Sequence, residues 1–371
     1  MTPASSASPP RAPIGAAHAD PARHPAVVSR VLAPAWHLAP PAPDAPGSWA
    51  PFVLSPGSLD EPLLRVRDED GVARTLSNVC THRGMVLAAC PGHGRRLRCG
   101  YHGRRFRLDG ALESAPGFDG TPASPTPGSP TPGSRNPGFP GPDDSLPVVP
   151  EAEWGPLSFV SLAPDVPFAD WIAPIRARLD GLYTDALVHD PAGTREWIVA
   201  APWALYLDNY LEGLHIPYVH RSLDGALAPG GYRIHLSPHG SLQVGEAASG
   251  EPAFDLPAGH PEAGRRIAAF WFHLFPTTLV NAYPWGLSVN VVEPLGPDRT
   301  RVRFLSWVAR PDLRSAGAGA DLDRVEHEDE VVVEAVAHGV RSRLYRGGGY
   351  APGHEDAVAH FHGLLRERAG A

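Results

Sequence analysis

The sequence predicts an α+β fold, in which a small all-β domain precedes a helix-grip domain. A helix grip is an antiparallel sheet wrapped on a long C-terminal helix. Short strand-like runs separated by turns occupy residues 45–160. Six longer strand-like runs follow between about 231 and 311, and a long amphipathic helix is expected at about 320–345. A sheet curved around a helix usually encloses an apolar cavity.

Composition shifts along the chain suggest three regions. Residues 1–25 are rich in Pro, Ala and Ser, and they predict a disordered leader that lacks the apolar core of a signal peptide. The first domain is expected over 26–165, with a low-complexity insertion at 121–142 that contains SPTPG twice. The second domain is expected over 166–371.

Overall composition excludes several functional classes. The 371-residue chain is 43% hydrophobic and has a net charge of −8, without a Lys/Arg-rich block. We therefore expect neither nucleic acid nor a membrane surface as partner. No apolar run reaches the length of a membrane helix. Three cysteines do not form a secreted disulfide framework, so we expect a cytoplasmic protein.

The elements of the first domain follow from period-two apolar patterns and turn residues. The run DEDG indicates a hairpin between two of the strands. The predicted strands lie in WAPFVL, PLLRVRD, RTLSNV, RLRCGYHGRRFRLDGAL, SLPVVP and WGPLSFVSL.

The second domain begins with helical periodicity and continues as a meander. FADWIAPIRARLDGLY and ALYLDNYLEGLH predict helices on either side of the strand REWIVAAPW. The tight turn LGPDR joins the last two strands, and a short helix is expected at 354–368. The meander strands are GYRIHLSP, SLQVGEA, IAAFWFHLFP, TTLVNAYP, GLSVNVVEP and RTRVRFLSWVARP.

The first candidate site lies in the loops CTHRG and CGYHG of the β-domain. The first loop contains Cys80 and His82, and the second contains Cys99 and His102. Each loop therefore offers one thiolate and one imidazole as ligands. A Rieske 2Fe-2S centre needs this arrangement, with two thiolates on one iron and two imidazoles on the other. Structural zinc is the alternative, although zinc fingers pair Cys with Cys and His with His. Cys90 is expected to be a small buried apolar residue.

The second candidate site is DNYLEGLHIPYVH at 208–220. On a regular helix Asp208, Glu212 and His215 share one face, which makes the two acids candidate catalytic residues. Pro217 must bend the chain, so that His220 can turn back toward His215. The alternative is an amphipathic helix with incidental histidines.

A third ligand for these histidines is available on the long helix. Asp329 falls on its apolar stripe, and a carboxylate on a buried face must be paired, protonated or bound to metal. Pairing with an arginine is the alternative. Two imidazoles and one carboxylate with open positions form the facial triad of non-haem iron(II) oxygenases.

Together the two motifs resemble those of the α-subunits of Rieske non-haem iron oxygenases. The resemblance covers roughly residues 40–371, and it is strongest to the branch that contains choline and carnitine monooxygenases. The resemblance implies that Cys80, His82, Cys99 and His102 hold a 2Fe-2S cluster and that His215, His220 and Asp329 hold mononuclear Fe(II). It also implies a homotrimer, in which an acid at the position of Glu212 links the two metal sites of neighbouring subunits. Arg104 departs from the family, which usually has Trp after YHG.

The resemblance implies a terminal oxygenase. It would use O2 and electrons from NAD(P)H, delivered by a separate ferredoxin or flavin reductase, to hydroxylate or oxidatively demethylate a small organic substrate. Ring cis-dihydroxylation of an arene is the alternative within this enzyme class. A Rieske electron carrier fused to a non-catalytic apolar-ligand-binding domain is the alternative of another class. Aromatic residues of the meander, among them Trp271, Tyr283 and Trp285, are candidates for the cavity wall.

Overall fold

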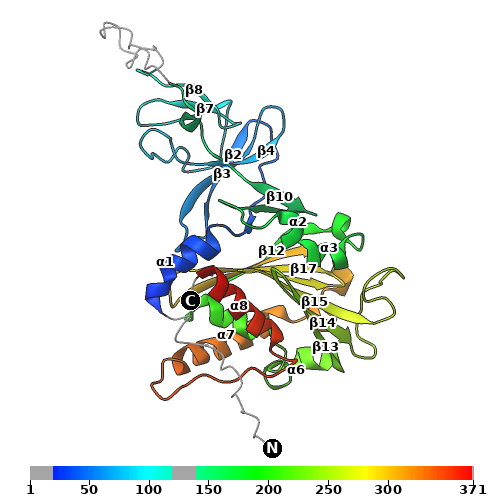
Figure 1. The fold of residues 1–371 in the computed structure, drawn as a ribbon. Coiled ribbons are helices and arrows are strands. Elements are labelled where there is room, and N and C mark those ends of the chain that lie inside the picture. Colours follow the sequence, from blue (N-terminus) through cyan, green and yellow to red (C-terminus); the bar gives the residue numbers. More distant parts are fainter. Residues whose placement is uncertain (1–19, 119–138, 370–371) are drawn as a thin grey trace, which may run out of the picture. The chain divides into compact units, whose positions relative to one another are not determined.

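The computed structural model describes residues 20–118 and 139–369, which form two compact units (Figure 1). The smaller unit comprises residues 36–153 and 157–164, and the larger unit comprises the remainder of the described chain. The predicted leader at 1–25 and the insertion at 121–142 lie largely outside the described residues. Among the described residues, no helix is both long and apolar enough to cross a membrane.

The N-terminal boundary differs from the predicted one. Helical turns begin at Pro21, within the predicted leader, and the carboxylate of Asp20 accepts a hydrogen bond from the backbone N–H of Ala22 at 2.9 Å. Residues 26–35 belong to the larger unit instead of the β-domain. The reason is that Val31 is fully buried in the apolar core of the larger unit. The turns are η1 (Pro21–Arg23), α1 (His24–Val27) and η2 (Val28–Leu32).

The smaller unit is built from antiparallel strands, as predicted. One sheet has the order β5-β2-β3-β4-β9, a second β6-β7-β8 and a third β1-β11-β10. The second sheet carries the loop between β6 and β7 that contains CGYHG. The strands are β1 (His37–Ala39), β2 (Ser48–Leu54), β3 (Glu61–Arg67), β4 (Ala73–Ser77), β5 (Gly92–His93), β6 (Arg96–Arg98), β7 (Arg105–Arg107), β8 (Leu112–Ser114), β9 (Val148–Val149), β10 (Glu151–Trp154) and β11 (Leu157–Val160), with the short helix η3 (Pro142–Asp144).

The larger unit is an antiparallel sheet that carries helices on one face. Its strand order, β12-β18-β17-β16-β15-β14-β13, is a meander from β13 to β18 with β12 added at the end. The strands are β12 (Val188–Val199), β13 (Leu227–Ser237), β14 (Gly240–Ala247), β15 (Ile267–Leu274), β16 (Thr278–Tyr283), β17 (Gly286–Pro294) and β18 (Thr300–Val308).

Helices α4, α7 and α8 share a buried apolar core with this sheet (Figure 1). The long C-terminal helix of the predicted helix grip is α7, and the predicted helix at 354–368 is α8. The helices are α2 (Phe168–Trp171), α3 (Ala173–Leu179), α4 (Trp203–Tyr210), α5 (Ile216–Val219), α6 (Arg221–Ala226), α7 (Leu322–Gly339) and α8 (Asp356–Ala369), with the short turns η4 (Thr184–Ala186), η5 (Pro311–Leu313) and η6 (Gly317–Gly319).

The β16–β17 hairpin depends on a glycine. Gly286 has φ +149°, and a Cβ atom there would lie 2.2 Å from the carbonyl oxygen of Trp307 on β18. Gly286→Ala should therefore destabilise the larger unit by about 3 kcal/mol, because the sheet backbone must move to admit the methyl group. Urea denaturation measures the loss of unfolding free energy.

Gly296→Ala is the matched control for this variant. Gly296 also has positive φ, at +135°, in the next hairpin, but a Cβ atom there would meet nothing within 4 Å. Its loss should be clearly smaller than that of Gly286→Ala. Equal losses for the two variants would show that backbone conformation, not the contact with β18, sets the requirement for glycine.

Candidate metal centres

The two Cys–His loops of the smaller unit have the same backbone conformation. The N–H of Gly84 donates to the carbonyl of Cys80 at 3.0 Å, and the N–H of Gly103 donates to the carbonyl of Cys99 at 3.1 Å. Both glycines have positive φ, +73° and +76°, which side chains rarely permit. The repeated turn is the local reason for glycine at the end of both motifs.

These loops bring their four candidate ligands together. Cys80 and Cys99 are buried free thiols, and burial raises the pKa of Cys80, whose thiol also contacts that of Cys99. The rings of His82 and His102 lie with centroids 4.6 Å apart. The buried Nδ1 atom of His82 has no hydrogen-bond partner among the described residues. Two thiols and two imidazoles, one with an unsatisfied ring nitrogen, fit the donor set of a Rieske 2Fe-2S centre.

Arg104 fills a buried site behind these loops. Its Nη1 atom donates to Asp144 Oδ1 at 3.1 Å and to Thr81 Oγ1 at 3.2 Å. The guanidinium lies 5.3 Å from the ring centroids of both Phe118 and Phe139. Its positive charge adds to burial in lowering the pKa of the neighbouring His82. Arg104, which stands where the resembled family usually has Trp, is therefore a buried structural part of the region around the two loops.

Cys90 does not belong to this group. The sequence predicted a buried apolar role for it, but its side chain is exposed. It follows the loop that carries Cys80 and lies before β5. Its exposure corrects the prediction and makes it a useful control residue.

The second motif folds differently from the expected continuous helix. Helix α4 ends at Tyr210, and α5 starts at Ile216, so the single helical face predicted for Asp208, Glu212 and His215 is wrong. The physical reason is that the carboxylate of Glu212 accepts hydrogen bonds from the backbone N–H groups of Leu214 and His215. These bonds form a turn in place of the helix.

The predicted bend nevertheless brings the two histidines together. Pro217 occupies the first turn of α5, and the rings of His215 and His220 lie with centroids 5.1 Å apart. From α7, Asp329 approaches both. Its Oδ1 atom lies 2.9 Å from His220 Nε2 and 3.6 Å from His215 Nε2. One ligand atom from each of the three residues lies within 4.8 Å of the others.

The partners of Asp329 decide between the two interpretations of this acid. Besides the two histidines, Asn209 donates to its Oδ1 atom at 2.5 Å. The carboxylate thus faces imidazoles and an amide, and not the arginine of the alternative prediction. Two histidines and one carboxylate converging on one point fit the facial donor set of a mononuclear iron(II) site.

Each histidine is also held through its other ring nitrogen. Glu212 Oε1 lies 2.5 Å from His215 Nδ1, and Glu328 Oε2 lies 2.9 Å from His220 Nδ1. These contacts favour the tautomers that leave both Nε2 atoms free as ligands. Glu328 was missed by the sequence analysis, although it directly precedes Asp329.

Asp208 lies apart from the triad. Its Oδ1 atom accepts a hydrogen bond from His362 of α8 at 2.8 Å, and the other ring nitrogen of His362 lies 2.7 Å from the hydroxyl of Tyr350. Asp208 therefore connects α4 with α8. The structure does not support the predicted catalytic role.

A cavity of about 70 Å³, called the iron-side cavity here, lies beside the triad and has an aromatic wall. Trp271 and Tyr283 line it, as the sequence suggested. Phe270 and Phe272 alternate with Trp271 along β15, and they pack on the other face of the sheet beside each other. Further lining residues that the sequence analysis did not identify are Tyr210, Tyr232, Gln243 and Asn281.

One carboxyl group of α7 also reaches this cavity. Glu326 accepts a hydrogen bond from the hydroxyl of Tyr206 at 2.9 Å and from the amide of Asn290 at 3.5 Å. Burial, aided by the charge of Asp329, raises the pKa of Glu326 to about 8. Its position three residues before Asp329, one turn along the same helix, is the sequence signal that could have found it.

Two family models match this chain. One describes the Rieske [2Fe-2S] domain and matches residues 54–125. The other describes the ring-hydroxylating alpha subunit catalytic domain and matches residues 183–371, just over half of the chain. The two matches contain the first and second candidate metal centres, respectively.

Curated relatives share both regions. The chain is 27% identical to a chloroplastic choline monooxygenase of Arabidopsis thaliana over 326 residues, covering 82% of this chain and 71% of the relative. It is 26% identical to a carnitine monooxygenase oxygenase subunit of Escherichia coli over 329 residues, covering 83% and 81%.

Solved structures of Rieske oxygenases have the same fold. A quaternary ammonium Rieske monooxygenase aligns with a TM-score of 0.67 at 20% identity, covering 93% of this chain and 91% of that one. A naphthalene 1,2-dioxygenase from Rhodococcus sp. aligns with a TM-score of 0.63 at 23% identity, covering 95% and 93%.

Proposed function

The chain belongs to the family of ring-hydroxylating α-subunits of Rieske non-haem iron oxygenases, and on that premise we propose that it oxygenates a small molecule carrying a quaternary ammonium group. It is an oxidoreductase that hydroxylates or demethylates a small substrate, with a Rieske 2Fe-2S cluster and mononuclear iron as cofactors. The larger unit matches a catalytic-domain model, so the alternative of a non-catalytic ligand-binding domain is wrong.

Ligand assignment follows from the two residue groups. Cys80, His82, Cys99 and His102 would hold the cluster, and His215, His220 and Asp329 would hold the mononuclear iron. When bound, these groups supply electron storage and O2 activation. The protein contributes the fixed geometry of the ligands, the tautomers favoured by Glu212 and Glu328, and an aromatic-walled cavity beside the triad.

One observation carries the substrate class: the cavity next to the triad has aromatic walls. Tyr210, Tyr232, Trp271 and Tyr283 line it, and the carboxyl of Glu326 reaches it. Aromatic faces attract quaternary ammonium groups, which have no N–H and therefore cannot donate hydrogen bonds to the protein. The relatives named as choline and carnitine monooxygenases support the same class.

A substrate panel tests this proposal. The purified holoenzyme, supplied with a flavin and ferredoxin-type reductase and NADH, is offered choline, carnitine, the neutral choline isostere 3,3-dimethylbutan-1-ol, and naphthalene. We expect substrate-dependent O2 uptake and an oxygenated product with a quaternary ammonium compound. Coupled turnover of naphthalene to a cis-diol, with no ammonium substrate turned over, would replace the proposal with arene dihydroxylation.

We further propose the partners that such an enzyme requires. A separate reductase delivers electrons from NAD(P)H to the cluster, in the cytoplasm, where that donor is available. The protein works as a homotrimer, in which Glu212 connects the cluster of one subunit to the mononuclear iron of the next. A solved quaternary ammonium Rieske monooxygenase is described in terms of inter-subunit electron transfer, which supports this arrangement.

The bridging role of Glu212 makes a kinetic prediction. Glu212→Gln should retain both metal centres but slow cluster reoxidation in a single turnover by about 10–100-fold, because the amide no longer accepts a hydrogen bond from each of two imidazoles. Stopped-flow absorbance of the reduced cluster after mixing with substrate and O2 measures the rate.

Glu328→Gln is the control, since Glu328 holds His220 in the same way that Glu212 holds His215. With rates normalised to iron content, it should reoxidise its cluster much faster than Glu212→Gln. Equal slowing in both variants would assign Glu212 to histidine orientation alone, and a wild-type rate would remove its bridging role.

A further inference from the structure

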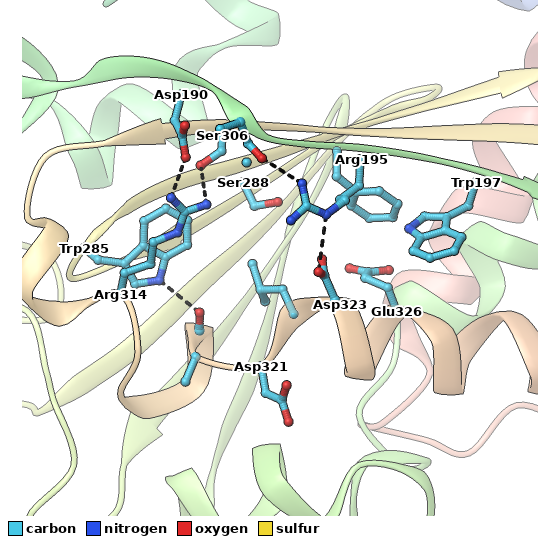
Figure 2. Close-up of a pocket in the computed structure, with 16 residues that line it drawn as sticks. Asp190, Arg195, Trp197, Trp285, Ser288, Ser306, Arg314, Asp321, Asp323 and Glu326 are labelled. Carbon is cyan, nitrogen blue, oxygen red and sulfur yellow. Dashed lines mark hydrogen bonds and ion pairs between the residues drawn. The ribbon is translucent and has the colours of Figure 1, made fainter.

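A second and larger hollow lies next to the iron-side cavity. It measures about 470 Å³ and is called the chamber here. Figure 2 shows that it lies between the first turns of α7 and the strands β12, β17 and β18. Leu322 and Glu326 line both the chamber and the iron-side cavity. They are one helical turn apart, so this turn of α7 forms the wall that the two hollows share.

The arginines of the chamber are already engaged by its own acids. Arg314 pairs with Asp190 and lies 3.5 Å from the hydroxyl of Ser306, and Arg195 pairs with Asp323 at 3.3 Å (Figure 2). Their positive charges are therefore neutralised within the wall. An anionic ligand would have to compete with these carboxylates for the guanidinium groups.

The remaining lining favours a cation. Counting acidic and basic side chains, the chamber has four carboxyl groups, including Asp321 and Glu326, against two guanidinium groups, so negative charge remains in excess even while Glu326 is protonated. Trp197 and Phe304 add aromatic faces, whereas the ring of Trp285 is already covered by the guanidinium of Arg314, 5.6 Å from its centroid. A hollow with excess negative charge and aromatic walls concentrates cations.

The iron-side cavity is the smaller of the two hollows, at about 70 Å³ against about 470 Å³. Leu322 and Glu326 line both hollows. A substrate that places one group at the triad and is too long for the iron-side cavity can therefore extend past these two side chains into the chamber.

Glu326 lies where such a substrate would pass. The two groups that hydrogen-bond its carboxyl, the hydroxyl of Tyr206 and the amide of Asn290, are both uncharged. Neutral partners do not supply the counter-ion that the ionised form of a partly buried carboxyl group requires. A cationic ligand at the passage would supply it.

We propose that the chamber is the route by which a cationic substrate reaches the iron-side cavity, and that Glu326, at the passage, is the residue that selects for positive charge. The inference rests on the proposed function, because it assigns the charge selection of that same site. Leu322, on the preceding turn, forms the steric part of the passage.

Equilibrium binding tests the charge selection. Choline and 3,3-dimethylbutan-1-ol, which share shape but differ in charge, are titrated into the holoenzyme by calorimetry. Glu326→Gln should weaken choline binding by at least about tenfold and leave the neutral isostere within about twofold, with unchanged iron and sulfide content. Glu334→Gln, an exposed acid of the same helix that lines neither hollow, should bind both probes as the wild type does.

The outcomes separate this inference from the proposed function. Equal weakening of both probes by Glu326→Gln, or no weakening, overturns the charge selection, even if choline is turned over. A wild-type preference for choline that Glu326→Gln abolishes, without any oxygenated ammonium product, sustains the selection and removes the proposed function. A wild-type protein that does not prefer choline overturns both.

The passage itself is tested by kinetics. Leu322→Phe should slow both association and dissociation of choline several-fold, measured by stopped-flow fluorescence of the chamber tryptophans, because the larger side chain narrows the route. Val331→Phe, on an exposed position of the same helix, is the control and should leave both rates unchanged. If Leu322→Phe instead speeds choline dissociation and leaves the association rate at the wild-type value, Leu322 only contacts bound choline. That result would contradict the proposal that substrate passes through the chamber.

Discussion

Asp329→Ala is expected to retain the Rieske cluster, lose the mononuclear iron and reduce product formation by more than about 100-fold. Replacing a residue that only supports a metal ligand costs up to about 100-fold in activity, and the loss of a ligand itself should cost more. Asp329 is the carboxylate of the proposed triad, and it approaches the Nε2 atoms of both His215 and His220. Without it, two neutral imidazoles remain, and neither supplies the negative charge that favours Fe(II) retention.

Iron and sulfide analysis checks this result. The variant should contain about two irons and two sulfides per chain, against about three irons in the wild type. His327→Ala, an exposed histidine two residues away on α7, is the control and should retain full iron and activity. Unchanged iron content in Asp329→Ala would mean that the third ligand lies elsewhere.

Cys99→Ser is expected to abolish the visible spectrum of the cluster and, with it, all electron delivery to the mononuclear site. Cys99 is buried beside Cys80, and its backbone is fixed by hydrogen bonds between its N–H and Arg104 and between its carbonyl and Gly103. A serine hydroxyl at this position remains protonated near neutral pH and does not replace a thiolate ligand.

The chain contains its own control for this variant. Cys90 is exposed and lies outside the two Cys–His loops, so Cys90→Ser should keep the cluster spectrum and activity. Loss of the spectrum in both variants would indicate a general sensitivity to cysteine replacement. An unchanged spectrum in Cys99→Ser would contradict the Rieske assignment.

Much of the fold was predictable because its elements are encoded by local patterns. The meander from β13 to β18 has clear turns between apolar strands, and the two Cys–His loops each end with the glycine that their turn requires. The proline in HIPYVH correctly predicted the return of His220 toward His215. These features depend on neighbours in the sequence and are visible without the tertiary structure.

The features that were not predicted depend on contacts between distant segments. Helix α4 ends at Tyr210 because the carboxylate of Glu212 bonds to the following backbone, an arrangement that competes with helix continuation. The partner of Asp208 was not predicted, because His362 is 154 residues away in the chain. Residues 26–35 join the larger unit because Val31 is buried there.

The charged groups around the site illustrate the same limit. In the sequence Glu326 is one of several acids on α7. Only the structure shows that it accepts hydrogen bonds from Asn290 of β17 and Tyr206 of α4. The neutralisation of Arg314 and Arg195 likewise depends on Asp190, on another element, and on Asp323 of α7. Periodicity assigns a residue to a helix face, but only packing decides which cavity that face meets.

The central claim, that one chain holds a Rieske cluster and a separate mononuclear iron, is tested most directly by metal analysis. Iron and acid-labile sulfide are measured per chain, with an EPR spectrum of the dithionite-reduced protein. The account predicts about three irons and two sulfides with a Rieske-type signal. Zinc without sulfide, and no such signal, would contradict it.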